Sequence, residues 1–222
     1  MKIQAGYTAD RRSFISNVIR IATKGRSSHV FIVFTLNDVE WKWFLEKYPH
    51  AMKERIGRDT DGMIRMYFES IWKRDPHTRR SGVRGPYSLE KLLQWVDEGK
   101  STHLFDLQDI RDLRDYEMRD VLAECIRDVG ALQYAPLQLF WNLKTLMRGV
   151  ARPYKKRTKE FVTCVEFVAR VLPGRYSKAY LDMGYITLEE YVPSSRRDNG
   201  LGLYELIDKA NAIYRLQKGA SE

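Results

Sequence analysis

The chain has 222 residues, of which 44% are hydrophobic and 30% are charged. This composition is that of a folded globular protein and excludes an intrinsically disordered chain. The formal net charge of +9 favours anionic partners, such as nucleic acid, phospholipid headgroups or an acidic polymer. Since no nucleic-acid-binding motif accompanies the charge, the sequence argues against nucleic acid as the partner.

The chain contains two cysteines, Cys125 and Cys164, and four histidines. Two cysteines cannot build the disulfide framework of a small secreted module, and no CxxC or HxxxH spacing supplies metal ligands. We therefore expect a reducing compartment, no metal and no cofactor. The N-terminus lacks the apolar run of a signal peptide, and the longest uncharged stretch, 129–143, is too short to span a bilayer. These features predict a cytoplasmic or virion-associated protein with no signal peptide and no transmembrane segment.

The first third of the chain predicts two strands separated by a helix. Residues 1–7 predict a short strand, and a helix that begins near Asp10 or Ser13 follows it. The apolar side of this helix is expected to face the core and consists of Phe14, Val18, Ile19 and Ala22. Residues 29–36 open with His29 and continue with β-branched and aromatic residues, which predicts a strand covered on both faces.

The middle of the chain predicts two more strands, two helices and an insertion. Residues 37–61 predict a partly helical insertion, which we expect to form one wall of a cleft. Residues 63–72 predict a strand that carries Glu69 towards its end. The residues rich in Pro, Gly and Arg at 75–86 predict a loop. The remaining elements are a helix over 87–96 capped by Ser88, a strand over 103–107 and a helix over 112–129.

The C-terminal part contains one densely basic segment, residues 148–159, which is either a solvated loop or a patch that guides substrate. The apolar and aromatic residues 134–147 precede it and predict a helix or a covering loop. A helix at 164–172 ends at a Pro-Gly pair. Beyond it, we expect a strand at 185–187 and a terminal helix over about 203–216.

The start of the helix at 164–172 carries the most informative pattern in the chain. Thr163 and Glu166 are three residues apart and form a capping box, which makes Cys164 the first helical residue. A helix start stabilises negative charge, so Cys164 is predicted to hold more thiolate than an ordinary cysteine. The same N–H groups can stabilise an oxyanion. The alternative is that Cys164 packs in the core as a small apolar residue, the interpretation that we adopt for Cys125.

A thiol nucleophile needs a nearby base, and histidine is the side chain suited to this task at neutral pH. His50 and His77 lie in polar loops beside prolines, and His103 begins a short, weak strand. Only His29 opens a strongly apolar strand of the predicted sheet. His29 is therefore the candidate base, and the alternative is an ordinary histidine at a strand edge.

Four short motifs resemble one known family when they are taken in chain order. They are Ser27-Ser-His-Val-Phe-Ile-Val33, Tyr67-Phe-Glu-Ser70, Gly130-Ala-Leu-Gln-Tyr134 and Thr163-Cys-Val-Glu-Phe-Val168. Their order is similar to that of the circularly permuted, NlpC-type papain-like cysteine hydrolases. In that family an N-terminal Ser-His-Val strand supplies the base, and a Cys-x-Glu-Phe-Val helix near the C-terminal end supplies the nucleophile.

The resemblance implies an α+β, circularly permuted papain-like fold. This fold has a central antiparallel sheet packed against helices and a nucleophile at a helix N-terminus. Residues 1–192 would form the catalytic domain, with the insertion at 37–61, and residues 193–222 would form a helical extension.

The resemblance also implies the roles of individual residues. Cys164 would be the nucleophile, His29 the base, and Glu69 the group that orients the imidazole or lines the site. The alternative for Glu69 is a surface residue at a strand end. The implied substrate-binding residues are Ser28, Tyr134 and Thr163, and for Tyr134 a buried structural tyrosine is the alternative.

The function implied by the family is a thiol hydrolase that cleaves an amide, isopeptide or acyl bond through an acyl-enzyme, without metal or cofactor. Its substrate would be a peptide, a cell-wall polymer or a lipid acyl group, and an anionic surface would suit the basic charge. One alternative is an acyltransferase that uses a lipid or amine acceptor, for which residues 137–147 would form a lipid-facing cover. Another is a non-enzymatic virion- or wall-associated binding module on the same fold.

Overall fold

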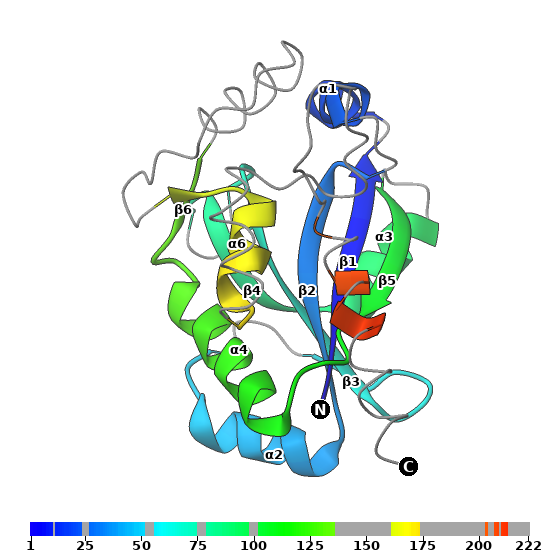
Figure 1. Cartoon of the computed structure of the whole chain (residues 1–222). Coiled ribbons are helices and arrows are strands. Elements are labelled where there is room, and N and C mark those ends of the chain that lie inside the picture. The colour runs from blue at the N-terminus through cyan, green and yellow to red at the C-terminus, as the bar shows by residue number, and fades with distance from the viewer. Residues whose placement is uncertain are drawn as a thin grey trace.

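A computed structural model describes most of the N-terminal part of the chain and a few C-terminal residues. The described residues are 1–10, 12–23, 27–51, 56–74, 79–97, 102–135 and 161–173, together with 203, 207, 208 and 210–212. They form an α+β structure in which a five-stranded antiparallel sheet packs against helices (Figure 1).

The sheet has the strand order β4-β3-β2-β1-β5. Its strands are β1 (Lys2–Asp10), β2 (His29–Leu36), β3 (Ile64–Ile71), β4 (Gly82–Ser88) and β5 (Thr102–Asp109). β2 is central, and its register pairs His29 with Thr8 of β1 and Phe31 with Glu69 of β3. His29 and Glu69 therefore lie on neighbouring strands, at the end of the sheet where β2 begins.

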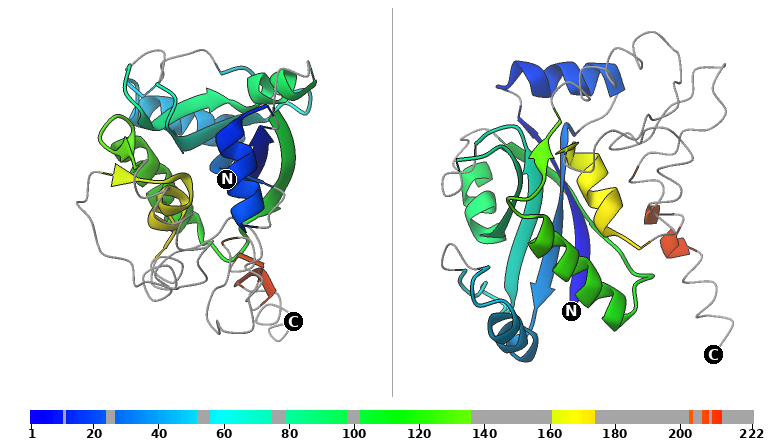
Figure 2. Two further views of the ribbon diagram at one scale, coloured as in Figure 1. Left: turned by 90° about the horizontal axis from the view of Figure 1, so that it is seen from above. Right: turned by 90° about the vertical axis from the view of Figure 1, so that its left-hand side faces the viewer.

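Helices cover both faces of the sheet, as the two views in Figure 2 show. On one face, α4 (Asp115–Asp128) and α6 (Cys164–Val171) contribute to the main core, which includes Val30, Ile32 and Phe34 of β2. On the other face, Phe31 and Val33 pack with the start of α3 (Leu89–Asp97). Because successive strand residues point to opposite faces, a strand buried on both sides has to be apolar throughout. The sequence prediction for residues 29–36 is thus confirmed.

The predicted loop at 75–86 is wrong in its last part, because residues 82–88 form β4. Gly82 and Gly85 suggested a loop, but both have close backbone neighbours in other segments of the chain. A Cβ atom on Gly82 would lie 2.0 Å from the Leu132 carbonyl oxygen, and one on Gly85 would lie 2.7 Å from the Tyr67 carbonyl oxygen. Both residues have positive φ angles, of 135° and 128°, which favour glycine. These glycines therefore allow close packing at an edge strand, where such residues are tolerated.

Two predictions about the ends of the sheet also need correction. The insertion forms the helix α2 (Asp38–Lys47), as expected, but α2 follows the end of β2 that is remote from His29 (Figure 1). The described part of the insertion is therefore no wall of a cleft beside His29. The helix α1 (Phe14–Thr23) forms where it was predicted, but Phe14 is exposed, whereas Ile19 is buried.

Two short strands, β6 (Gln133–Tyr134) and β7 (Phe161–Val162), form a parallel pair just before α6. This pair fixes the chain directly before Cys164 to the segment that contains Tyr134. Of the predicted helix or covering loop at 134–147, Tyr134 belongs to β6. Residues 136–147 and the predicted elements at 148–159 and 185–187 lie outside the described residues.

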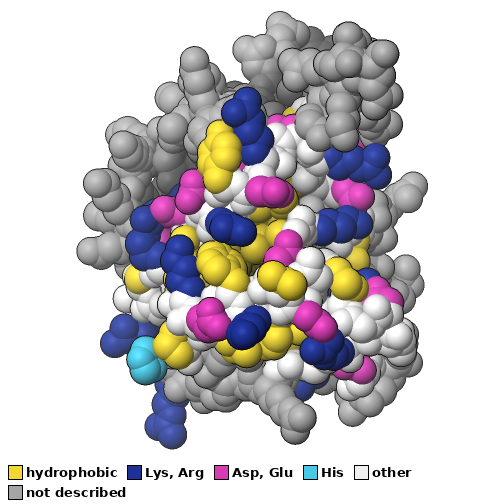
Figure 3. Space-filling view, turned by 90° about the horizontal axis from the view of Figure 1, so that it is seen from below, with side chains coloured by type: hydrophobic (Ala, Val, Ile, Leu, Met, Phe, Trp, Pro, Cys, Tyr) yellow, Lys and Arg dark blue, Asp and Glu magenta, His cyan; other side chains and the backbone are white. Residues whose placement is uncertain are grey.

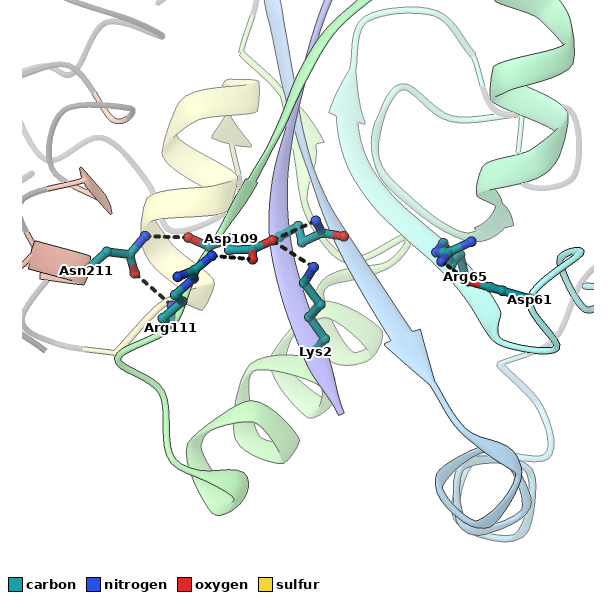
Figure 4. Close-up of polar contacts among 7 residues, drawn as sticks. Lys2, Asp61, Arg65, Asp109, Arg111 and Asn211 are labelled. Carbon is teal, nitrogen blue, oxygen red and sulfur yellow. Dashed lines mark hydrogen bonds and ion pairs between the residues drawn. The ribbon is translucent and has the colours of Figure 1, made fainter. Parts of the chain in front are cut away.

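Several of the described C-terminal residues pack against the rest of the structure. Leu203 and Ile207 are completely buried in the main core. Asn211 donates to the Asp109 carbonyl (2.6 Å) and accepts from the Arg111 backbone N–H (2.8 Å), as Figure 4 shows. These residues are helical, in agreement with the terminal helix expected from about 203. No helix within the described residues combines the length and the apolar character that crossing a membrane requires.

Candidate functional site

The N-terminus of α6 has the cap that the sequence predicts. The Thr163 hydroxyl accepts from the Glu166 backbone N–H (3.4 Å), and the Thr163 N–H donates to the Glu166 carboxylate (2.6 Å). Cys164 is the first residue of α6 and is buried. The Thr163 hydroxyl is used by the cap, so its direct contribution in this structure is to fix the helix start next to the thiol.

His29 lies between the thiol of Cys164 and the carboxylate of Glu69. The His29 Nε2 atom donates to the Glu69 Oε2 atom at 2.6 Å. On its other side the imidazole interacts with Cys164, which is among the groups that raise the pKa of His29. Since Nε2 is occupied by Glu69, Nδ1 is the ring nitrogen left for the thiol. The structure thus brings together the three residues that the sequence selected as candidate catalytic groups.

Arg84 of β4 completes this cluster, and the sequence analysis missed it. Its Nε and Nη2 atoms both donate to the Glu69 Oε1 atom, at 2.9 and 2.6 Å. One oxygen of Glu69 therefore serves Arg84 and the other serves His29. The sequence offered one signal for Arg84, namely a charged residue among the uncharged residues Gly82, Val83, Gly85 and Pro86. The two glycines, however, made this segment look like a loop.

The charges in this cluster depend on one another because all three side chains are largely buried. The exposed fractions are 19% for His29, 7% for Glu69 and 14% for Arg84. Burial opposes the charge on His29, but hydrogen bonds and charge interactions with Cys164 and Glu69 outweigh it and raise the pKa of His29 to about 10.

The same interactions keep the carboxylate ionised. Burial acts to raise the pKa of Glu69, but the contacts with His29 and Arg84 outweigh it and lower this pKa to about 2. Burial likewise opposes the charge on Arg84, and Glu69 outweighs that effect and raises the pKa of the guanidinium. At neutral pH the imidazolium and the guanidinium thus flank one carboxylate.

Tyr134 is buried beside the start of α6. In the β6–β7 pair it lies opposite Val162, two residues before Cys164. Burial, followed by the charges of Cys164 and Glu166, raises the pKa of Tyr134 well above its ordinary value. The hydroxyl of Tyr134 is thus a neutral group that is close enough to Cys164 for their charges to interact.

Ser28 is buried and has a structural contact beside His29. Its hydroxyl bonds to the hydroxyl of Ser16 in α1, and its backbone N–H donates to the Thr8 carbonyl (2.9 Å). In this structure Ser28 therefore joins α1 to the start of β2.

The other candidate groups lie away from this cluster or outside the described side chains. Cys125 is completely buried in α4, and burial raises the pKa of its thiol well above the ordinary value. His50 follows α2 at the opposite end of the sheet. The side chains of His77 and His103 are not among those described. Within the described residues, no group of three or more His, Cys, Asp or Glu side chains is arranged to hold a metal ion.

Comparisons with known proteins give no match to this chain. No protein-family model, no curated protein and no solved structure matches its sequence or its fold. The functional inference therefore depends on the geometry of the site and on the resemblance of its motifs.

Proposed function

We propose that the protein is a cysteine hydrolase with a circularly permuted papain-like fold, in which Cys164 is the nucleophile and His29 the base. The observation that carries the proposal is the position of His29, which bonds to the Glu69 carboxylate and interacts electrostatically with Cys164. The chain order, with the strand of the base before the helix of the nucleophile, supports the permuted form of this fold.

The first half of the reaction forms an acyl-enzyme. In the resting enzyme the proton of the Cys164 thiol already lies on His29, and the thiolate sulfur attacks the carbonyl carbon of the substrate. The N–H groups at the start of α6, which have no acceptor within the helix, are suited to stabilise the oxyanion. When the carbon–heteroatom bond breaks, the leaving group takes the proton from His29.

The second half returns the enzyme to its starting state. His29, now neutral, accepts a proton from a water molecule as the water oxygen attacks the thioester carbon. The bond between carbon and sulfur breaks, the acid is released, and the proton on His29 again balances the thiolate. Amide, isopeptide and acyl bonds all present the same carbonyl carbon, so the proposed chemistry applies to each class.

Glu69 and Arg84 have positioning roles in this proposal. Glu69 fixes the ring of His29 so that Nδ1 faces the thiol, and it stabilises the imidazolium. Arg84 holds Glu69 by two donors and balances its charge. With Arg84 present, two cations match the two anions of a thiolate and a carboxylate, which lowers the cost of burying both anions.

A chromogenic acetyl ester tests the proposal without knowledge of the natural substrate. Incubation with p-nitrophenyl acetate should acetylate Cys164, detected by intact mass and peptide mapping, and the acetyl group should then be lost to water. Cys164→Ala should abolish the adduct, and His29→Ala should slow its formation by roughly a hundredfold. The matched control is Cys125→Ala, which should leave both steps unchanged. If Cys164 is acetylated no faster than a free thiol, or at the same rate in His29→Ala as in the wild type, the result would instead support a non-enzymatic binding module.

A further inference from the structure

The helix α1 presents large apolar side chains to solvent. Phe14 is 80% exposed and Ile21 is 78% exposed. They are seven residues apart, close to two helical turns, and therefore lie on the same side of α1. The opposite side is fixed to the protein through Ile19 in the core and through the contact between the Ser16 and Ser28 hydroxyls. The outward direction of Phe14 and Ile21 is thus determined by packing.

A third apolar side chain is exposed at the same end of the sheet. Trp72 follows the last residue of β3 and is 44% exposed. This is the end at which β2 begins with His29, and α1 lies across it (Figures 1 and 2). All three exposed apolar side chains therefore lie at the end of the sheet that holds the candidate site.

Cations accompany these apolar side chains. Arg12 precedes α1, Lys73 and Arg74 follow Trp72, and all three are exposed. Within the described part of the chain, none of these three side chains forms an ion pair. At the opposite end of the sheet, by contrast, Arg58 pairs with Asp38.

The opposite end also exposes apolar residues, but their setting is different. Val39 and Leu45 of α2 are both exposed. Figure 3, a view of this end, shows apolar side chains that lie among cations and anions. Lys42 and Lys47 of α2 form no ion pair among the described residues either, but they share this helix with Asp38, Glu40 and Glu46.

We propose that the surface formed by Phe14, Ile21, Trp72, Arg12, Lys73 and Arg74, named the α1 surface, binds to anionic lipid bilayers. Aliphatic and aromatic side chains enter the boundary between headgroups and acyl chains, and cations pair with anionic headgroups. A nucleic acid would use the cations but leave Phe14 and Ile21 in water. Binding in this orientation turns the His29 end of the sheet towards the membrane. The inference holds whether or not Cys164 is a nucleophile.

Sedimentation of the full-length chain with vesicles tests the proposal. We expect binding to vesicles of phosphatidylcholine and phosphatidylglycerol, and much weaker binding to phosphatidylcholine alone. Phe14→Ser/Ile21→Ser should weaken binding to the anionic vesicles by roughly tenfold or more. Lys73→Glu/Arg74→Glu should also weaken it, by at least about fivefold for each cation lost.

The matched control is Val39→Ser/Leu45→Ser on α2, which removes exposed apolar side chains from the opposite end and should leave vesicle binding unchanged. All these positions are exposed, so the fold should be retained, and circular dichroism checks this. Absence of binding to anionic vesicles would overturn the proposal. So would equal loss in the α2 variant, or binding that neither α1-surface variant weakens.

Discussion

The strand β3 carries two clusters of Arg and carboxylate groups in different surroundings. Near its start, Arg65 pairs with Asp59 and Asp61, as Figure 4 shows for Asp61, and 47% of the Asp61 side chain is exposed. Near its end, Glu69 bonds to His29 and Arg84 and is almost completely buried. Residues 65 and 69 point to the same face, since strand side chains alternate.

The difference between these clusters lies in solvent access. The pKa of Asp61 is lowered chiefly by a hydrogen bond from the Met63 backbone and also by Arg65, but water screens this pair. In the Glu69 cluster, the low dielectric strengthens each interaction and penalises each unpaired charge. The same residue types therefore form a surface contact at one end and control a protonation state at the other.

Removing the central carboxylate should have the largest effect. Glu69→Gln removes the carboxylate that pairs with both the buried guanidinium of Arg84 and the buried imidazolium of His29, which should lower the free energy of unfolding by about 3 kcal/mol. Urea denaturation measures this change. The matched control is Asp61→Asn, which should have little effect because the position is exposed. A loss for Glu69→Gln as small as that of the control would contradict the comparison.

Removing the arginine should have a smaller effect. Arg84→Gln loses two charge-assisted hydrogen bonds but leaves the pair of Glu69 and His29, so we expect a cost of about 2 kcal/mol. Arg65→Gln, the matched change in the other cluster, should cost less.

A separate readout distinguishes positioning by Arg84 from a structural role alone. Loss of the Arg84 charge makes the net charge of the buried site more negative by one unit, which disfavours the thiolate. Alkylation of the thiol in Arg84→Gln should therefore require a higher pH than in the wild type. Arg84→Lys, which keeps the charge, should restore most of the original pH profile. If the pH profile of alkylation is the same in Arg84→Gln as in the wild type, the role of Arg84 is structural only.

The pH dependence of stability gives a more gradual effect. The pKa of His29 is raised from 6.5 to about 10, so its contribution is complete below pH 6.5 and is lost as the pH rises towards 10. The pKa of Glu69 is lowered from 4.5 to about 2, so its contribution is complete above pH 4.5 and is lost as the pH falls towards 2.

The difference in unfolding free energy between wild type and His29→Gln should therefore be largest between pH 4.5 and 6.5 and should decline on both sides. Chemical denaturation at a series of pH values measures it. A difference that stays constant from pH 6.5 to 10 would contradict a raised His29 pKa.

The sequence predicted the local parts of this site better than its long-range contacts. The capping box of Thr163 and Glu166 depends on residues three positions apart, so the place of Cys164 at a helix start followed from the pattern alone. The contact between His29 and Glu69 depends on the register of two strands, which no local pattern specifies. For that contact, the motif resemblance supplied the expectation.

Two misinterpretations have a physical reason in tertiary packing. Arg84 was missed because Gly82 and Gly85 resemble turn residues, whereas their lack of a Cβ allows the backbone at Leu132 and at Tyr67 to approach closely. Phe14 was wrongly assigned to the buried side of α1, which Ile19 and Val18 do occupy, because apolar residues occur around much of this helix. The contact between Ser16 and Ser28 helps to select the side that faces the protein and leaves Phe14 outside.

The rate of Cys164 alkylation by iodoacetamide in the folded protein tests the central claim most directly, because the thiolate is the reacting form. Measured across a pH series with peptide mapping, it requires no natural substrate. We predict rapid modification of Cys164 at neutral pH, no modification of the buried Cys125, and a rate for Cys164 that is roughly a hundredfold lower in His29→Ala. Equal rates for Cys164 in the wild type and in His29→Ala would contradict the pairing of thiol and imidazole.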